Sequence, residues 1–376
     1  MLIGGYASVG TSKRAAIISR LQPVAVNPES RYLISRSSLA DSRLADETRF
    51  GLPVPEVLDT EEIATAEGAS EASGDPLAIG DTLGVLNVGF VEYMDCMGSD
   101  GEIADAARTS YTGGKRSQKD AALLRYLMRH QHTTPFEMGT LKFRLYIPIF
   151  VYRQLFRHRT ASQLEPDIAD CITNDTAFQK FSVQNEMSGR YVEMPDHYYI
   201  PELAGIQKQS TDNKQGRDAA SYTREEQRAI RESIVRDTAA ARERYQSSLD
   251  RGVAKELGRA ILPLSQYTLL VWKIDLKNLL HFVHLRIHAH AQYEVREYAR
   301  ALLAVVRSAF PICAEAFSDY MIDGERLTRQ EIEALRDSMT KADREKVLAA
   351  FCARVSNSRE RGEFAVKLGI PDSKLL

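Results

Sequence analysis

Residues 140–159 constrain the fold more than any other stretch of this chain. From Thr140 to Ile147, large apolar residues alternate strictly with residues of a more polar face: Leu141, Phe143, Leu145 and Ile147 against Lys142, Arg144 and Tyr146. A period of two predicts a half-buried strand. Pro148 suits the first turn of a helix, so PIFVYRQLFRHR (148–159) is predicted to leave the strand as a helix. The chain therefore needs a fold that packs helices against a sheet.

Further elements are predicted on both sides of this segment. Apolar residues between Leu83 and Phe90 suggest a strand. Helical patterns occupy 101–111, 119–130, 224–251 and 276–310. Thr328 and Glu331 form a capping-box pattern before a short helix. We expect an α+β fold, a modest and mostly antiparallel sheet with long helices.

The 376 residues allow one large domain or two smaller ones. Residues 60–80 are rich in Ala, Glu, Ser and Gly, which predicts a mobile linker. We expect an N-terminal extension over 1–80 that is disordered in part, and an organised part that begins at about Asp81.

Composition excludes several classes of protein. The net charge is −2, which argues against a surface built for nucleic acid or an anionic membrane. No apolar run approaches the ~20 residues of a membrane span, and the N-terminus lacks a secretory pattern. The four cysteines are far apart, so they are interpreted as reduced thiols of a cytoplasmic protein: Cys96, Cys171, Cys313 and Cys352.

Two polar clusters could bind a phosphate or a nucleotide. Gln154 precedes Arg157-His158-Arg159, which is either a solvated helix end or a phosphate clamp, because arginine forks match phosphate oxygens. The segment 185–191 reads NEMSGRY, and in an extended chain Glu186, Ser188 and Arg190 would share one face. That face is either an ordinary polar surface or a nucleotide site.

Two further clusters carry histidines. HTTPFE (132–137) predicts a turn, with Glu137 entering the strand behind it. Between Asp275 and Glu294, a helix face shared by His281, His284 and His288 leaves a metal site open, although no acidic ligand is interleaved. Arg286 lies among apolar residues and needs a carboxylate or an anionic ligand as its partner.

Together these segments resemble the flavin-dependent thymidylate synthases. The family signature RHRxxSxNExSxRY is present in two halves, RHRTAS at 157–162 and NEMSGRY at 185–191. Similar context surrounds them: AARTS at 106–110, HTTPFE at 132–137, GRAILPL at 258–264 and LRIHAHAQYE at 285–294. The resemblance spans about residues 82–318, which implies a catalytic domain over 81–318 and leaves a C-terminal helical extension over 319–376. About 21 extra residues, roughly 164–184, split the signature.

The resemblance implies a reaction and its ligands. It implies reductive methylation of dUMP to dTMP, with FAD as cofactor, and with methylenetetrahydrofolate and NADPH as co-substrates. It also implies a homotetramer with shared active sites, and no nucleic-acid or membrane partner.

The resemblance also implies site residues. For dUMP these are Gln154, Arg157, Glu186, Ser188, Gly189, Arg190, Arg259 and Arg286. For FAD they are Ser110, His132, Thr134, Glu137, Arg157, His158, Arg159, Asn185, Asp275, Lys277 and His281. The last three stand where many members carry Asn, Arg and Asn. Arg286 is expected to be catalytic by stabilising negative charge on the uracil ring, and Ser188 is interpreted as a ligand rather than a nucleophile.

Two other functions stay open. The insert could have left a catalytically impaired homologue that still binds flavin or nucleotide. The histidine cluster could belong to a metal-dependent phosphohydrolase, although no metal site is part of the preferred interpretation.

Overall fold

A computed structural model describes residues 76–110, 120–155, 184–211 and 215–370 of the chain. Within them, five antiparallel strands form the main sheet in the order β1-β2-β3-β7-β4. Their bounds are β1 Thr82–Val85, β2 Gly89–Met97, β3 Thr140–Pro148, β7 Tyr267–Asp275 and β4 Gln184–Glu186. A separate hairpin pairs β5 Gln207–Gln209 with β6 Arg217–Ser221. The expected α+β class with a mostly antiparallel sheet is confirmed.

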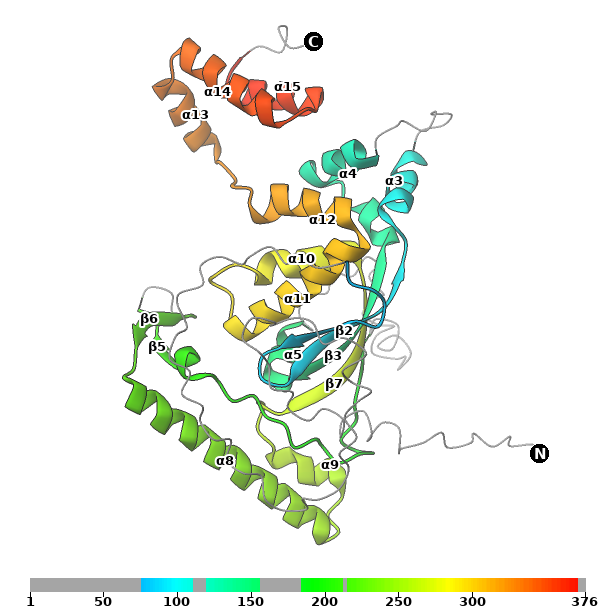
Figure 1. The fold of residues 1–376 in the computed structure, drawn as a ribbon, viewed down its shortest axis with the longest axis vertical. Helices are drawn as coiled ribbons and strands as arrows, with labels where there is room; N and C mark the ends of the chain where they lie inside the picture. Colours follow the sequence, from blue (N-terminus) through cyan, green and yellow to red (C-terminus); the bar gives the residue numbers. More distant parts are fainter. Residues whose placement is uncertain (1–75, 111–119, 156–183, 212–214, 371–376) are drawn as a thin grey trace, which may run out of the picture.

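Helices surround this sheet (Figure 1). The α-helices are α3 Asp100–Arg108, α4 Asp120–Arg129, α5 Ile149–Leu155, α8 Arg224–Asp250, α9 Lys255–Gly258, α10 Leu276–Arg286, α11 Tyr293–Ala309, α12 Pro311–Phe317, α13 Arg329–Ser338, α14 Lys341–Arg354 and α15 Ser358–Lys367. Shorter turns are η1 Thr134–Met138, η2 Leu203–Gly205, η3 Arg259–Ile261 and the π-helical η4 Ser318–Ile322. Figure 1 shows α8 at one end of the molecule and α13 to α15 at the other.

The strand predicted from alternation is β3, and it has a hydrophobic cluster on each face. Leu141, Phe143 and Leu145 belong to the main core, which also contains residues of α10, α11 and α12. Tyr146 was expected on a polar face, but it is fully buried. It packs with Phe90 and Tyr267 on the opposite face. The strand is therefore buried on both faces at its C-terminal end.

Two predicted elements are wrong as single units. The strand expected between Leu83 and Phe90 is a hairpin, because the chain turns at 86–88 with Leu86 at φ +59° before β2 begins. The helix expected over 276–310 breaks into α10 and α11, since residues 288–290 are exposed and offer no apolar face to bury. Arg296 Nη1 donates to the carbonyl oxygen of Ala289 at 2.9 Å and holds the intervening turn.

Other elements agree with the sequence patterns. α3, α4 and α8 lie where helices are predicted, and Thr328 and Glu331 form the capping box at α13. The helix that follows Pro148 is described as far as Leu155. Arg157, His158, Arg159 and insert residues 164–183 lie outside the described residues, as do residues 1–75.

Candidate functional site

The start of α10 brings together segments far apart in the sequence. Asp275 caps this helix, because its Oδ1 accepts from the backbone N–H of Asn278 at 2.9 Å. One residue on, the backbone N–H of Leu276 donates to the carbonyl oxygen of Gly139 at 2.9 Å, which joins α10 to the end of η1. The Nζ of Lys277 then forms an ion pair with Glu137. Two predicted flavin residues, 140 positions apart, are thus in contact.

Glu137 lies in η1 and not in the strand that follows, which corrects the prediction from the sequence. Pro135 near the start of this turn has no N–H to leave unpaired, and its fixed φ suits a helical turn.

Four other predicted flavin residues near these segments are exposed. Ser110 follows α3, His132 precedes η1, and Thr134 is the first residue of η1. His281 lies one helical turn beyond Lys277. Within the described part of the chain, none of these four side chains makes a hydrogen bond. Hydroxyl and imidazole groups in this state can bind a polar ligand.

β4 supplies two residues to opposite faces of the sheet. Asn185, which is exposed, pairs with Val271 of β7, and Glu186 pairs with Leu270. Glu186 Oε1 accepts a hydrogen bond from Thr268 Oγ1 at 2.8 Å. The Glu186 carboxylate is thus oriented by the neighbouring strand.

The segment after Glu186 turns, so the expected extended face is wrong. The backbone N–H of Tyr191 donates to the carbonyl oxygen of Ser188 at 3.1 Å. The backbone N–H of Arg190 donates to Ser188 Oγ at 3.3 Å. A serine that bonds to a backbone N–H two residues on favours a turn over a strand. Ser188 therefore serves the backbone here, and no base lies beside it in this motif.

Gly189 allows two chain segments to approach closely. A Cβ at this position would lie 2.8 Å from Arg259 Cδ and 2.8 Å from Met194 Sδ. Arg259 is exposed and makes no ion pair within the described part of the chain. Arg190, the residue after Gly189, forms an ion pair with Glu256 of α9 at 3.0 Å. Both side chains of this pair are more than half exposed. Two arginines thus lie around one turn, in an arrangement suited to an anion.

Gln154 enters a chain of hydrogen bonds that the sequence did not reveal. It donates to Gln292 Oε1, and Gln292 Nε2 donates to Glu294 Oε2 at 2.9 Å. Glu294 is fully buried and accepts from Tyr199 OH at 2.8 Å and from Arg217. Burial alone would raise the pKa of Glu294, but the Arg217 guanidinium and the hydrogen bonds to the carboxylate together outweigh it, and the pKa lies below its ordinary value. Gln292 and Glu294 lie in the LRIHAHAQYE motif (285–294), and this motif was the sequence feature from which they could have been selected as site residues.

Arg286 is the last residue of α10 and is partly buried. The segment after Arg286 leads to Gln292 at the start of α11, and Gln292 is the residue to which the Gln154 side chain donates its hydrogen bond.

The histidines of α10 do not share one helix face as predicted. α10 ends at Arg286, so His288 lies in the turn beyond it. The rings of His284 and His288 are 5.4 Å apart at a steep angle, and burial lowers the pKa of His284. Among the described residues, no three His, Cys, Asp or Glu side chains form a group that could hold a metal ion.

Cys96, Cys313 and Cys352 are free thiols, while Cys171 lies outside the described residues. Burial raises the pKa of Cys313, which keeps this thiol protonated. No helix in the described ranges is both long and apolar enough to span a membrane.

Comparison with known proteins identifies the family. The family model described as "Thymidylate synthase complementing protein" matches residues 91–312. A flavin-dependent thymidylate synthase of Thermus thermophilus is 42% identical over 271 residues, which are 72% of this chain and 90% of the relative. One from Ehrlichia ruminantium is 41% identical over 253 residues, which are 67% of this chain and 78% of the relative.

A solved structure is also similar. The crystal structure of a UMP/dUMP methylase, PolB from Streptomyces cacaoi, has a TM-score of 0.51 and 28% identity, and the match covers 62% of this chain and 95% of that one. The sequence motifs, the fold and these relatives agree, and the chain belongs to the flavin-dependent thymidylate synthases, a family of methyltransferases.

Proposed function

We propose that this protein converts dUMP to dTMP by reductive methylation. In this proposal methylenetetrahydrofolate donates the carbon, and FAD reduced by NADPH carries the hydride. The relatives named flavin-dependent thymidylate synthase support it, as does a neighbouring structure described as PolB bound with 5-Br dUMP. The packing of Arg259 against Gly189 is the observation in this chain that carries the nucleotide part.

The dUMP phosphate is proposed to bind beside the turn at 188–191. Arg190 and Arg259 lie around Gly189, and guanidinium groups bind phosphate oxygens in pairs of hydrogen bonds. Arg190 is already paired with Glu256, but that contact is exposed and weak, so a phosphate can replace it. The full proposed set is Gln154, Arg157, Glu186, Ser188, Gly189, Arg190, Arg259 and Arg286.

The residues proposed for FAD fit a large polar ligand. His132, Thr134 and His281 are exposed and make no side-chain hydrogen bond within the described ranges, and they lie on segments joined by the Glu137–Lys277 ion pair. The complete proposed set is Ser110, His132, Thr134, Glu137, Arg157, His158, Arg159, Asn185, Asp275, Lys277 and His281. When bound, reduced flavin supplies a hydride, and the protein supplies position and electrostatics.

Arg286 is proposed as the catalytic residue. Its guanidinium cannot serve as a base at neutral pH, because the pKa of arginine lies above about 12. It can stabilise negative charge that develops on the uracil ring, which activates the substrate without a cysteine adduct.

A homotetramer with shared active sites belongs to the proposal. Large apolar side chains are exposed close in sequence to Arg190 and Arg259: Tyr191, Val253, Leu257, Ile261 and Leu264. These side chains lie in α9, in η3 and in the loops beside them, where they are available to a protein interface.

The test is the visible absorption spectrum of the purified protein, recorded before and after addition of dUMP. Bound FAD with bands that shift on dUMP addition is the expected result. Arg286→Ala is expected to keep FAD and lose turnover. Arg300→Ala, which removes an exposed arginine paired with Glu297, is the control and should keep both. A purified protein that binds no FAD contradicts the proposed function. Normal turnover in Arg286→Ala contradicts the catalytic role proposed for Arg286.

The impaired homologue is the second candidate, because 21 extra residues split the signature. Deletion of residues 164–184 distinguishes the two. A gain of activity from an inactive parent favours the impaired homologue, and an active parent dismisses it.

A further inference from the structure

The C-terminal helices α13, α14 and α15 begin beyond the residues that match the family model. Their own core is small: Leu348, Glu360 and Ala365 are the buried residues of the three helices. One of these three is a carboxylate. Charged contacts to the rest of the protein must therefore contribute to how these helices are held.

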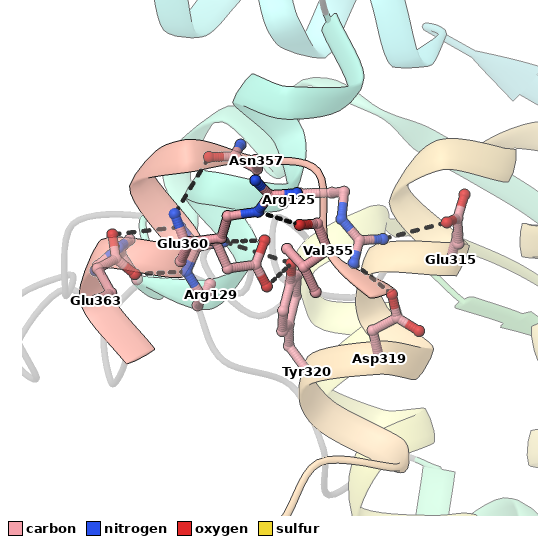
Figure 2. Close-up of polar contacts among 11 residues, drawn as sticks. Arg125, Arg129, Glu315, Asp319, Tyr320, Val355, Asn357, Glu360 and Glu363 are labelled. Carbon is pink, nitrogen blue, oxygen red and sulfur yellow. Dashed lines mark hydrogen bonds and ion pairs between the residues drawn. The ribbon is translucent and has the colours of Figure 1, made fainter. Parts of the chain in front are cut away.

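These contacts converge on the C-terminal end of α4 (Figure 2). The guanidinium of Arg129 lies 3.1 Å from Glu360 Oε2 and 2.8 Å from Glu363 Oε2. The side chains of Arg129 and Glu360 are only 12% and 9% exposed. His130 Nε2 lies 3.0 Å from Glu363 Oε1, and Tyr320 OH donates to Glu360 Oε1 at 2.9 Å. Glu363 thus contacts two consecutive residues where α4 ends.

A ring in α4 extends this contact to a proposed flavin residue. The Tyr126 ring lies 4.4 Å from the His130 ring and 5.8 Å from the His132 ring. The guanidinium of Arg359 in α15 lies 5.0 Å from the same Tyr126 ring. Helix α15 therefore touches both His130 and the aromatic side chain beside His132.

The backbone between them is in an unusual conformation. Gln131 has φ +56°, in the left-handed region that favours glycine. The backbone N–H of His132 donates to the carbonyl oxygen of Leu127, and that of Gln131 donates to Met128. This is the Schellman helix end, with Gln131 at the position where glycine is common. A non-glycine residue at this position is strained, which makes the turn easier to open. Contacts made by the neighbouring residues therefore contribute more to keeping the turn closed.

We propose that Glu363 is a positioning residue for the flavin site. By binding Arg129 and His130, it fixes the end of α4 and with it the direction in which His132 leaves the helix. The inference depends on the proposed function, because it assumes that His132 binds FAD. The C-terminal extension then acts as a clamp that prepares this part of the site before FAD arrives.

The test compares Glu363→Gln with Glu333→Gln in the full-length protein. Glu363→Gln keeps the side-chain size and removes the charge that Arg129 and His130 share. Glu333→Gln removes the carboxylate of an exposed pair with Arg329 in α13 and is the matched control. The dissociation constant for FAD, measured by flavin fluorescence, is expected to rise about two- to five-fold for Glu363→Gln, the effect of losing one ion pair. It should not change for Glu333→Gln.

Two readouts separate positioning from a general loss of stability. Amide hydrogen exchange without FAD should become faster in Glu363→Gln for the peptide that contains residues 130–134, and not in the sheet. In a double-mutant cycle, Glu363→Gln should have no further effect on FAD binding once His132 is replaced by Ala, because Glu363 acts through His132. If Glu363→Gln does not fold, His130→Gln, which alters the other side of the 3.0 Å contact with Glu363, serves in its place with the same expected direction.

The outcomes distinguish the two proposals. If the unaltered protein binds no FAD, the proposed function and this inference are both wrong. If it binds FAD but Glu363→Gln binds FAD equally well, or if its effect adds fully to that of His132→Ala, only the inference is wrong.

Discussion

Gly189→Ala is the sharpest perturbation of the proposed nucleotide site. The new methyl group would lie 2.8 Å from both Arg259 Cδ and Met194 Sδ, closer than carbon contacts allow. Gly189 does not have a positive φ, so the backbone itself accepts alanine. Both crowded atoms belong to flexible side chains. The expected response is that Arg259 and Met194 move while the fold is kept.

The expected magnitudes follow from these contacts. Inserting a methyl group into a packed site costs about 1–3 kcal/mol, and flexible neighbours place this case near the lower end. A charge-assisted hydrogen bond is worth about 1.5–3 kcal/mol. If Arg259 is displaced and one such bond to phosphate is lost, the dissociation constant for dUMP rises about 10- to 100-fold.

The assay is calorimetric titration of the FAD-loaded protein with dUMP, with a thermal unfolding curve for each variant. Gly101→Ala in α3 is the control, because its Cβ would meet Ser99 Oγ at 3.8 Å and Asp120 Oδ2 at 3.9 Å, which are ordinary contacts. This control should bind dUMP normally. Normal dUMP affinity in Gly189→Ala would refute the argument that close packing at Gly189 places Arg259 for the phosphate.

Three further predictions concern stability. Glu294→Gln should lower the free energy of unfolding, measured with urea, by about 3 kcal/mol, since it leaves Arg217 and Tyr199 without the buried carboxylate; a loss below 1 kcal/mol contradicts this. The pKa of Glu294 is lower in the folded protein, so its stabilisation is complete above the unfolded value of about 4.3 and is lost as the pH falls through the folded value. The unfolding free energy of Glu294→Gln should therefore depend less on pH below about 5, and parallel pH curves for the two proteins would argue against it. Gln131→Gly should raise the unfolding free energy by about 0.5–1 kcal/mol, because glycine adopts φ +56° without strain; an unchanged melting temperature contradicts that reason.

Local sequence patterns predicted those elements in which the burial of each residue follows from the pattern of its own segment. The alternation in β3 arises from burial of Leu141, Phe143 and Leu145 in the main core, and a period of two records that directly. The alternation placed Tyr146 on the polar face, although Tyr146 is buried, because its burial depends on Phe90 and Tyr267 of other strands. The break between α10 and α11 was missed because it contains neither glycine nor proline, the usual signals for the end of a helix.

In the candidate site, too, some residues could be predicted from the sequence, whereas their contacts could not. The family resemblance predicted Glu137 and Lys277 as site residues, and their contact follows only from the meeting of η1 with α10. Glu294 was not selected, because a buried carboxylate has no local pattern and its partners Tyr199 and Arg217 are 95 and 77 positions away. Polar networks formed across the sequence need the fold before they can be recognised.

The placement of the two candidate clusters supports the proposal that more than one chain contributes to each active site. Asp275 ends β7 and Lys277 follows it in α10, whereas Glu186 bonds to Thr268 near the start of β7. Seven residues of strand at about 3.3 Å each separate Thr268 from Asp275 by roughly 23 Å. Hydride transfer needs reacting atoms about 3–3.5 Å apart, so the flavin ring and the uracil ring must meet at one place. A second copy of the chain can bring its own flavin residues to the nucleotide residues of the first, while Asn185, the proposed flavin residue next to Glu186 in β4, would hold the part of FAD that reaches the nucleotide.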